Sequence, residues 1–555
     1  MKVVIIGGVA GGASAAARLR RLNEQAKIIV VERGPYVSFA NCGLPYYIGG
    51  EIRDRSALTL QTPQSFLTRF NIDVRVRCEA VKIDPAAKTV TLRDLESGGE
   101  TLESYDKLIL SPGASPVRPP IPGAELEGVF TLRNIPDTDA IRAYMESRAA
   151  KSALIVGGGY IGLEMAENLL RAGLSVTVAE MADHLIAPFD ADMAADVQQY
   201  VRQKGARLLL NSGVSAIEKQ PDGRLAARVG AQKVTADLIL LSVGVRPESA
   251  LAAAAGLQLN ERGQIVVDEA MHTSEADIYA VGDAVTVKNF YTGQETFVPL
   301  AGPANRQGRI AADNICGISS AYHGTQGTAI MRFFDLTAAS VGLNEKAAAA
   351  AGIAYDKTYT YPSSHATYYP GSTNMSIKVL WEKESGRLLG AQIVGFDGVD
   401  KRMDVLSAAM RFGAGITDLT ELELSYAPPF SSAKDPVNYL GFIGENVRAG
   451  RLQQFYWHDV DALPRDGSVT LLDVRTKTEA AADAIDGFLN IPLDALREHL
   501  DALPKDKPVY VHCFSGQRSY IACCILQENG YTCYNLAGGI RLYRSVKREQ
   551  VLQTQ

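Results

Sequence analysis

Two glycine-rich segments, which begin at Gly7 and Gly157, constrain the fold of this 555-residue chain more than any other feature. Each segment joins an apolar, strand-like run to a helical pattern and then to a second apolar run that ends at a glutamate. This order is typical of a βαβ unit in which glycines let the backbone approach a dinucleotide pyrophosphate at the N-terminus of the helix. Two such units predict an α/β chain with two dinucleotide-binding domains.

The second unit has the complete G-x-G-x-x-G register. Gly159 and Gly162 follow Gly157, and Glu180 ends the second strand 23 residues after Gly157. A carboxylate at this place hydrogen-bonds a ribose 2′-hydroxyl and repels a 2′-phosphate, so the pattern favours NADH without excluding NADPH. The residues that we expect at this cofactor are Gly157, Gly159, Tyr160, Ile161, Gly162, Glu180 and Gly244.

The first unit departs from this register at one position. Val9 stands where the central glycine is expected, although Gly8 and Gly11 are added on either side of it. Glu32 lies 25 residues after Gly7, where a carboxylate can bind ribose hydroxyls. The extra glycines preserve the close backbone approach that a pyrophosphate needs.

A later apolar strand ends in Gly282 and Asp283, where a carboxylate can hold a flavin ribityl hydroxyl. The short segments 108–116 and 238–247 look like crossings between two nucleotide domains. With these features the chain resembles the flavoprotein disulfide reductases with two dinucleotide domains, in which FAD binds first and NAD(P)H second. The resemblance implies that FAD contacts Gly7, Gly8, Ala10, Gly11, Gly12, Glu32, Arg33, Ala80, Ser111, Gly113, Gly282, Asp283 and Ala301.

Composition limits the environment and the partners. The net charge of −6 argues against nucleic acid or an anionic membrane as the main partner. Seven cysteines without regular spacing do not describe a disulfide framework, and they fit a reducing cytoplasm better. No run of about 18 uninterrupted apolar residues is present, so we expect no membrane span. No metal site is predicted.

Cys42 lies in the segment YVSFANCGLPYYIGG, where Gly43 and Pro45 favour a turn. No second cysteine is near it in the sequence, so it cannot form a local disulfide. A single thiol supplied with electrons by a flavin can accept one sulfur atom or one thiolate from a substrate. A buried structural cysteine is the simpler interpretation of this segment in isolation, but the cofactor motifs around it favour a redox role.

The segment HCFSGQRS, near the C-terminus, joins an apolar strand to a helix and resembles the rhodanese loop C-x4-R, with Cys513 first and Arg518 last. Asp473 and Arg475 match an early motif of that family, whereas Ala484 replaces its usual histidine. Backbone N–H groups of residues 514–519 and the Arg518 charge are expected to favour a thiolate or a persulfide. A catalytically inactive rhodanese fold is the alternative. We interpret the other cysteines as core residues: Cys78, Cys316, Cys523, Cys524 and Cys533.

The segment SFANCGLPYYIGG resembles the coenzyme A-disulfide reductases, and the whole chain resembles their fusions with rhodanese, the NADH-dependent persulfide reductases. The resemblance implies that Tyr368 and Tyr426 reach the cysteine across a dimer interface, with Tyr369 as a competitor for the first role. Basic residues on one face of the first helix suit the phosphates of CoA, although a solvated basic face is the alternative. The implied CoA pocket contains Ser14, Arg18, Arg21, Ser38, Asn41, Asn305, Arg306 and Lys434.

The predicted fold class is α/β, with two Rossmann-like dinucleotide-binding domains, an α+β dimerisation domain and a C-terminal rhodanese-like α/β domain. The expected boundaries are 1–117 and 244–320 for the FAD domain, 118–243 for the NAD(H) domain, 321–445 for dimerisation, 446–460 for a linker and 461–555 for rhodanese.

The predicted activity is the NADH-dependent reduction of CoA persulfide, polysulfide and CoA disulfide by a homodimeric cytoplasmic FAD enzyme. Its rhodanese domain would handle sulfane sulfur, and hydrosulfide would be released. Two alternatives remain open: an NADH oxidase or peroxidase that cycles Cys42 through sulfenic acid, and a redox-sensing binding protein.

Overall fold

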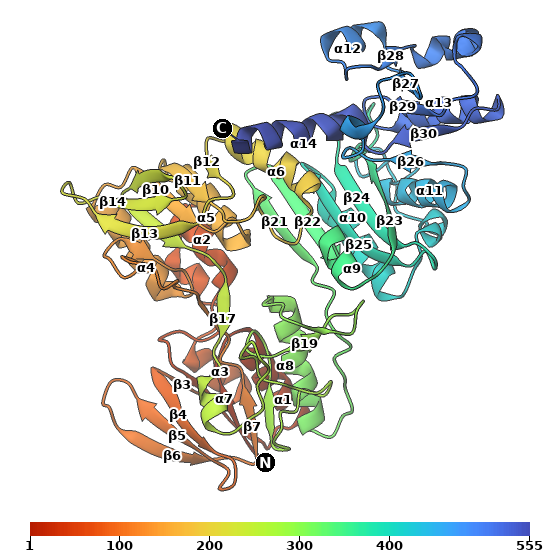
Figure 1. The fold of residues 1–555 in the computed structure, drawn as a ribbon. Helices are drawn as coiled ribbons and strands as arrows, with labels where there is room; N and C mark the ends of the chain where they lie inside the picture. The colour runs from red at the N-terminus through yellow and green to blue at the C-terminus, as the bar shows by residue number, and fades with distance from the viewer. Residues whose placement is uncertain (555) are drawn as a thin grey trace. The chain divides into compact units, whose positions relative to one another are not determined.

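The computed structural model describes residues 1–554, which divide into two compact units (Figure 1). The first unit contains Met1–Ala179 and Gly213–Thr325. The second contains Glu180–Ser212 and the residues from Gln326 onward. Among the described residues, no helix is both long enough and apolar enough to cross a membrane.

A parallel sheet forms the core of the N-terminal part of the first unit. Its strands lie in the order β18-β7-β1-β2-β3, and their apolar residues are buried because helices such as α1 and α8 cover the sheet. The elements are β1 (Lys2–Ile6), α1 (Ala10–Leu22), β2 (Lys27–Glu32), α2 (Leu44–Ile48), α3 (Pro63–Phe70), β3 (Asp73–Val76), β7 (Lys107–Leu110), β18 (Ile278–Ala280) and α8 (Ala301–Ile315). An antiparallel sheet of β4 (Cys78–Asp84), β5 (Thr89–Asp94) and β6 (Glu100–Ser104) adjoins them in sequence.

The same plan recurs in the middle of the chain. Parallel strands lie in the order β11-β10-β16-β9, with α5 connecting β10 to β11. The elements are β9 (Val129–Phe130), α4 (Ile135–Ser147), β10 (Ser152–Val156), α5 (Tyr160–Arg171), β11 (Ser175–Ala179) and β16 (Leu238–Leu241). As predicted, the two domains are joined by crossing strands, because β8 (Ala114–Pro116) pairs with β17 (Val245–Pro247).

The second unit contains an antiparallel sheet in the order β21-β22-β25-β24-β23. Helix α10 packs on its strands β22 and β25. The elements of this part are α6 (Ala191–Gln203), β21 (Ala329–Phe333), β22 (Leu336–Gly342), α9 (Glu345–Ala350), β23 (Tyr355–Thr360), β24 (Ser376–Glu382), β25 (Leu388–Gly395), α10 (Val399–Arg411) and α11 (Pro436–Arg448).

The C-terminal part of the second unit has a parallel sheet in the order β26-β30-β29-β27-β28. Its elements are β26 (Gln454–Phe455), β27 (Thr470–Asp473), α12 (Lys477–Ala482), β28 (Leu489–Asn490), β29 (Val509–His512), α13 (Gln517–Glu528), β30 (Cys533–Leu536) and α14 (Gly539–Thr554). The strand β26 corrects the expected linker 446–460. Gln454 and Phe455 pair with β30, so this sheet begins inside that segment.

Candidate functional site

The first glycine-rich turn has a backbone that only glycine fits. Gly7 has φ +96°, and a Cβ added to it would lie well inside contact distance of the Ser111 carbonyl oxygen. A Cβ on Gly12 would collide with the carbonyl oxygen of Gly7 in the same way. Glu32 accepts hydrogen bonds from the N–H groups of Gly8 at 2.9 Å and Gly34 at 2.8 Å, so its carboxylate is fixed beside the turn. This turn therefore fits the FAD pyrophosphate and ribose.

Helix α8 completes this cradle. It crosses α1 so closely that a Cβ on Gly308 would collide with the carbonyl oxygen of Gly11. Gln307, which the sequence did not indicate, accepts a hydrogen bond from Gly282 N–H at 2.7 Å and thereby orders the turn before Asp283. Partial desolvation raises the pKa of Asp283, and the nearby Arg133 opposes that effect.

The other residues predicted at FAD lie at element ends and turns of the same unit. Ala10 begins α1, Ala301 begins α8, and Ala80 lies at a bulge of β4. Ser111 donates its N–H to Ile6, and an added Cβ on Gly113 would enter open space. Arg33 forms ion pairs with Glu79 and Glu248 at 3.7 and 3.5 Å.

The second glycine-rich turn repeats the tight backbone and leaves room above it. Gly157 has φ +108° and approaches Ser242, and a Cβ on Gly162 would collide with Gly157. At Gly159, in contrast, an added Cβ would meet no atom within 4 Å, and the same holds for Gly244. Gly157 and Gly162 shape the turn, whereas the free space beside Gly159 can receive a pyrophosphate.

The remaining residues predicted at the nicotinamide cofactor flank this turn along the chain. Tyr160 and Ile161 are the first two residues of α5. Glu180 directly follows β11, and its Oε1 accepts a hydrogen bond from Ala182 N–H at 2.8 Å.

Cys42 lies in a short 3-10 turn (Asn41–Gly43) that leads directly into α2. The residue is exposed, yet surrounding atoms partly desolvate its sulfur. This desolvation raises the pKa of the thiol, and the negative charges of Glu164 and Asp283 raise it further. Ser38, with φ +46°, donates its N–H to Gly8 at 2.8 Å, which joins the cysteine segment to the FAD turn.

No sequence pattern indicated Glu164. It lies on α5, and Tyr46 Oη donates a hydrogen bond to its Oε1 at 3.4 Å. Desolvation raises the pKa of Glu164 to about 7, with a smaller contribution from the charge of Glu167. Because 122 residues separate Glu164 from Cys42, no local pattern could have connected them.

The structure brings together part of the predicted CoA pocket. Ser14 Oγ and Asn305 Oδ1 lie 2.8 Å apart, which joins α1 and α8 at that point. Arg18 forms an ion pair with the buried Asp313 at 2.6 Å, so the basic face carries less net positive charge than predicted. The other residues predicted for this pocket are placed as follows: Arg21 and Asn41 are exposed, Arg306 stacks on Tyr322, and Lys434 is an exposed residue of the second unit.

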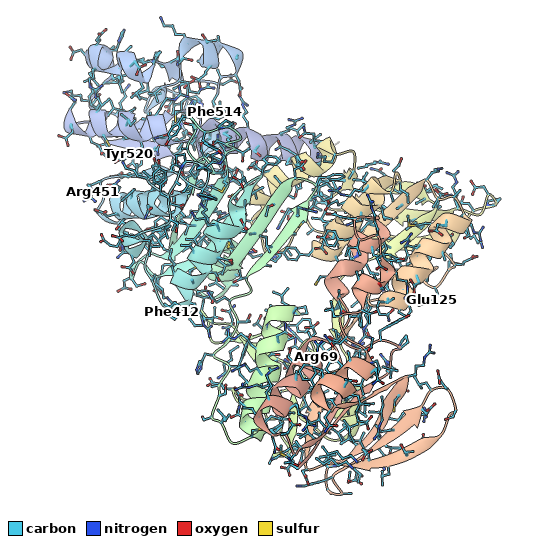
Figure 2. All side chains as sticks on the ribbon, turned by 180° about the vertical axis from the view of Figure 1, so that it is seen from behind. Arg69, Glu125, Phe412, Arg451, Phe514 and Tyr520 are labelled. Atoms are coloured by element: carbon cyan, nitrogen blue, oxygen red, sulfur yellow. The ribbon has the colours of Figure 1, made fainter. Side chains whose placement is uncertain are left out.

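The two predicted tyrosines of the second unit meet. Tyr368 and Tyr426 have their hydroxyl oxygens 3.1 Å apart, and this hydrogen bond raises the pKa of Tyr368. Tyr369 instead packs its ring against His365. The tyrosine pair is exposed, and so are Phe430 and Phe412 of the same unit. Phe412 is labelled in Figure 2.

Cys513 is fully buried at the end of β29. Its Sγ accepts hydrogen bonds from Gly516 N–H at 3.1 Å and Ser519 Oγ at 3.3 Å. Among the described residues, Gly516 supplies the backbone N–H group that donates to this sulfur, so the predicted cradle of residues 514–519 is smaller than expected.

The Arg518 guanidinium donates to both carboxylate oxygens of Glu479 at 2.7 Å. This pair is the main cause of the raised pKa of Arg518, and the charge of Cys513 raises it further, so Arg518 interacts with both groups. The pair lowers the pKa of Glu479 to about 2. Nearby, Arg475 binds Asp473 through two nitrogens.

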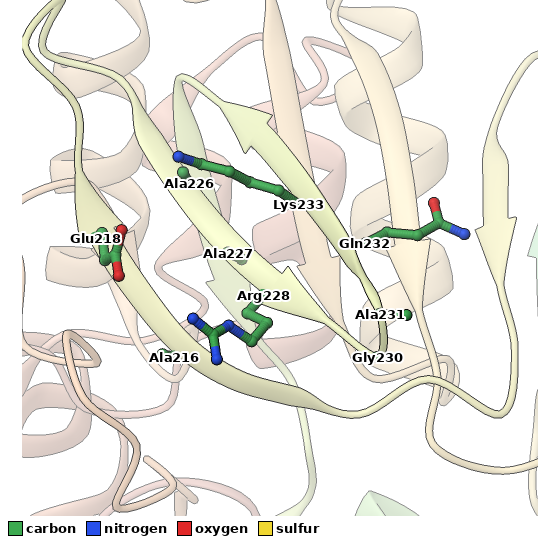
Figure 3. Close-up of a pocket in the computed structure, with 9 residues that line it drawn as sticks. All are labelled: Ala216, Glu218, Ala226, Ala227, Arg228, Gly230, Ala231, Gln232 and Lys233. Carbon is green, nitrogen blue, oxygen red and sulfur yellow. The ribbon is translucent and has the colours of Figure 1, made fainter.

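A cluster of carboxylates and a surface hollow lie elsewhere in the protein, and neither is a candidate active site. Three carboxylates converge at Asp190, Asp192 and Glu345, but the ammonium of Lys378 lies among them and takes the place a cation would need. A hollow of about 490 Å³ on the sheet of β13 (Val214–Lys219), β14 (Leu225–Val229) and β15 (Gln232–Ala236) is shown in Figure 3. Its lining contains no thiol or histidine: Ala216, Glu218, Ala226, Ala227, Arg228, Gly230, Ala231, Gln232 and Lys233.

Comparison with known protein families decides the assignment. A family model described as pyridine nucleotide-disulphide oxidoreductase matches residues 1–308, more than half of the chain. The chain belongs to this family. The dimerisation domain of the pyridine nucleotide-disulphide oxidoreductases matches residues 328–436, and a rhodanese-like domain matches residues 457–545. The predicted fold class, the enzyme class and the dependence on FAD and a nicotinamide dinucleotide are confirmed at the level of this family.

Individual members of the pyridine nucleotide-disulphide oxidoreductase family extend the similarity. A coenzyme A disulfide reductase of Staphylococcus epidermidis is 38% identical over 442 residues, 80% of this chain and 99% of that one. The reduced Bacillus anthracis CoADR-RHD structure has a TM-score of 0.96 and 48% identity, and the match covers 99% of this chain and 98% of that one. An NAD-dependent persulfide reductase from A. fulgidus has a TM-score of 0.91 and 38% identity, with 98% and 100% covered.

Proposed function

We propose that the chain is an NADH-dependent FAD enzyme that reduces CoA persulfide and CoA disulfide through Cys42, while its rhodanese domain handles sulfane sulfur. One observation carries the proposal. Cys42 is exposed and lies, without a second cysteine in its segment, in the same unit as both dinucleotide turns. The named relatives, a coenzyme A disulfide reductase and a persulfide reductase, support the choice of substrate.

Cys42 supplies the nucleophile. Its thiolate attacks the inner sulfur of a CoA persulfide, which releases hydrosulfide and forms a Cys42–S–S–CoA bond. When bound, FAD would pass two electrons from NADH to this disulfide, as flavins do in this family. Cys42 returns to thiolate, and CoA leaves as a thiol once it gains a proton. The hydroxyls of Tyr368 and Tyr426 are acids suited to that proton transfer, since their mutual hydrogen bond presets their orientation.

The other chain residues bind and orient the substrates. Glu32 and the Gly7 turn hold the FAD pyrophosphate and ribose, and the open space at Gly159 receives the NADH pyrophosphate, with Glu180 at the ribose. Ser14, Asn305 and two exposed arginines, Arg21 and Arg306, bind the CoA phosphates. Cys513, held by Gly516 and Ser519, accepts sulfane sulfur as a persulfide, and polysulfide is a further substrate.

The working form is a homodimer in a reducing cytoplasm. The exposed tyrosine pair and the match to a dimerisation domain support the dimer. Seven unpaired cysteines support the compartment, because structural disulfides persist in oxidising ones.

Anaerobic stopped-flow measurements test the activity. NADH-reduced enzyme should be reoxidised by CoA persulfide and by CoA disulfide, with hydrosulfide formed from the persulfide alone. Cys42→Ser should abolish both reactions. Cys513→Ser should leave the reaction with CoA disulfide intact. Rapid turnover with oxygen or hydrogen peroxide, and none with either CoA substrate, would instead assign an oxidase or peroxidase that cycles a Cys42 sulfenic acid.

A further inference from the structure

We propose that Glu479 determines which sulfur donors Cys513 accepts: by pairing with Arg518, it makes the site select a singly charged alkyl persulfide over a doubly charged donor such as thiosulfate. This inference rests on the proposed function, because it names the donor class for the same sulfur-handling cysteine. Glu479 acts through Arg518 and is a specificity-determining residue, not a catalytic one.

The fold places Arg518 beside the reacting sulfur. Cys513 directly follows β29 and α13 begins at Gln517, so Arg518 lies in the first turn of that helix. Residues on both sides of it bind the sulfur: Gly516 N–H lies 3.1 Å and Ser519 Oγ 3.3 Å from Cys513 Sγ. A guanidinium between these two contacts is positioned to bind an anion that reaches the sulfur.

Glu479 occupies the guanidinium that such an anion needs. Nη1 and Nη2 of Arg518 donate to Oε2 and Oε1 of Glu479, both at 2.7 Å. The same carboxylate accepts hydrogen bonds from the N–H and the hydroxyl of Thr476 at 2.9 and 2.8 Å, which cap α12. Together these bonds lower the pKa of Glu479 to about 2, so the carboxylate is ionised and fixed beside Arg518 at neutral pH.

Two further arginines near the loop are also paired. Arg475 binds Asp473 at 2.7 Å, and Arg544 binds Asp483 at 2.6 Å. Both arginines act on His512, the residue next to the reacting cysteine, so both are close to the site. Each of these cations is therefore balanced by a carboxylate. A second negative charge on a donor would have to leave water without a free cation to offset it.

The groups that a donor meets first are an aromatic ring and a paired charge. Cys513 is fully buried, whereas Phe514 is exposed and is labelled in Figure 2. The side chains of Arg518 and Glu479 are 33% and 35% exposed, so solvent reaches the pair. An uncharged alkyl group can pack on Phe514 without breaking the pair. Thiosulfate, in contrast, has to compete with Glu479 for the guanidinium.

The transfer itself needs no oxidant or reductant. The Cys513 thiolate attacks the outer sulfur of an alkyl persulfide anion, the S–S bond of the donor breaks, and the alkyl thiolate leaves. Cys513 then carries the persulfide, and one negative charge remains on each product. With thiosulfate the same attack expels sulfite, so two negative charges leave beside the Arg518–Glu479 pair.

Sulfur loading of Cys513 tests the proposal on full-length, FAD-loaded enzyme without NADH. Rapid quench and mass spectrometry of the Cys513 peptide give loading rates with inorganic thiosulfate and with pantetheine persulfide, which has the reacting end of CoA persulfide but no phosphates. Glu479→Gln should raise the thiosulfate rate about tenfold, because the freed guanidinium can bind the donor. The persulfide rate should stay close to that of the wild type. Glu498→Gln, at an exposed carboxylate of the same domain, should change neither rate.

No rise with thiosulfate in folded Glu479→Gln enzyme, or an equal rise with both donors, would overturn the proposal. The rise should also decline with added salt, because it depends on attraction between charges. A rise that salt does not affect would overturn the proposal as well, since a loosened loop alone gives that result.

If Glu479→Gln does not fold, Glu479→Asp replaces it. An aspartate at this position still caps Thr476, but it is too short to hold both nitrogens of Arg518, so a smaller rise with thiosulfate is expected. No rise would then overturn the proposal. Loading of the wild-type enzyme is scored separately. If neither donor loads it, the sulfur-handling role of Cys513 fails together with this inference, whereas normal loading with an unchanged donor preference in the variants overturns the Glu479 assignment alone.

Discussion

At the scale of single residues, two glycines of one turn have opposite roles. Gly162 packs against the Gly157 carbonyl, whereas Gly159 faces open space. Gly159→Ala should therefore fold normally but raise the KM for NADH at least about tenfold, a loss of about 1.4 kcal/mol of binding free energy. Gly162→Ala should instead lower the free energy of unfolding by roughly 1–3 kcal/mol through overpacking. Steady-state kinetics and thermal melts separate the two, and an unchanged KM in Gly159→Ala would contradict the assignment.

His512, the residue before Cys513, should make the stability of β29 depend on pH. It is fully buried, and desolvation lowers its pKa to about 4. Between its ordinary pKa of 6.5 and that value the unfolded state binds a proton that the folded state excludes, so stability falls as the pH falls. From pH 7 to pH 5 the loss is about 2 kcal/mol.

Hydrogen exchange in peptides that contain β29 measures this loss. His512→Gln should remove the pH-dependent part, whereas His499→Gln, at an exposed histidine, should retain it. The pH range from 7 to 5 lies above the range in which the folded Glu479 carboxyl titrates, since its pKa is lowered to about 2. Equal pH dependence in wild-type and His512→Gln proteins would contradict the assignment.

At the scale of elements, the C-terminal helix α14 links the sulfur-accepting loop to α6. The N–H groups of Ile540 and Arg541, near its start, bond to the carbonyls of Cys513 and Phe514 at 2.9 and 3.0 Å. Farther along, the buried Glu549 pairs with α6 (Figure 1). The loop and α6 are therefore held by one helix within the same unit.

Breaking the pair at Glu549 should loosen this link. Glu549→Ala leaves the buried Gln198 and the half-buried Arg202 of α6 without their shared carboxylate, and a buried donor that loses its partner costs about 1–3 kcal/mol. We expect faster hydrogen exchange in α14 and in α6. Arg548→Ala, at the preceding exposed residue, is the matched control. Similar exchange in both variants would show that the helix is held by its other contacts.

The elements also show what the sequence could and could not predict. Both glycine turns and the Cys513 loop follow from local patterns, because their geometry is set within a few consecutive residues. Glu164 and Glu479 could not be selected, since their partners lie 122 and 39 residues away in the chain. The strand β26 could not be predicted for a related reason. Two residues are too few to show an alternation of apolar and polar side chains, and they form a strand because they pair with β30.

At the scale of the whole molecule, the predicted roles of Cys42 and the tyrosine pair require two chains. If the tyrosines act on the cysteine of the partner subunit, a Cys42→Ser chain and a Tyr368→Phe/Tyr426→Phe chain carry complementary defects. A dimer of one of each contains one intact site, made from the cysteine of one chain and the tyrosines of the other. Random assembly in equal amounts gives intact sites at about a quarter of all positions.

Co-expression with two different affinity tags isolates the mixed dimers for assay with NADH and CoA disulfide. They should show about half of the wild-type activity per dimer, because one of the two sites is intact. Dimers of either parent alone should show none or little. Mixed dimers no more active than the average of the two parents would place the tyrosines over the cysteine of their own chain. Because a site that uses two chains is lost on dissociation, wild-type activity should also fall when the enzyme is diluted below its dimer dissociation constant.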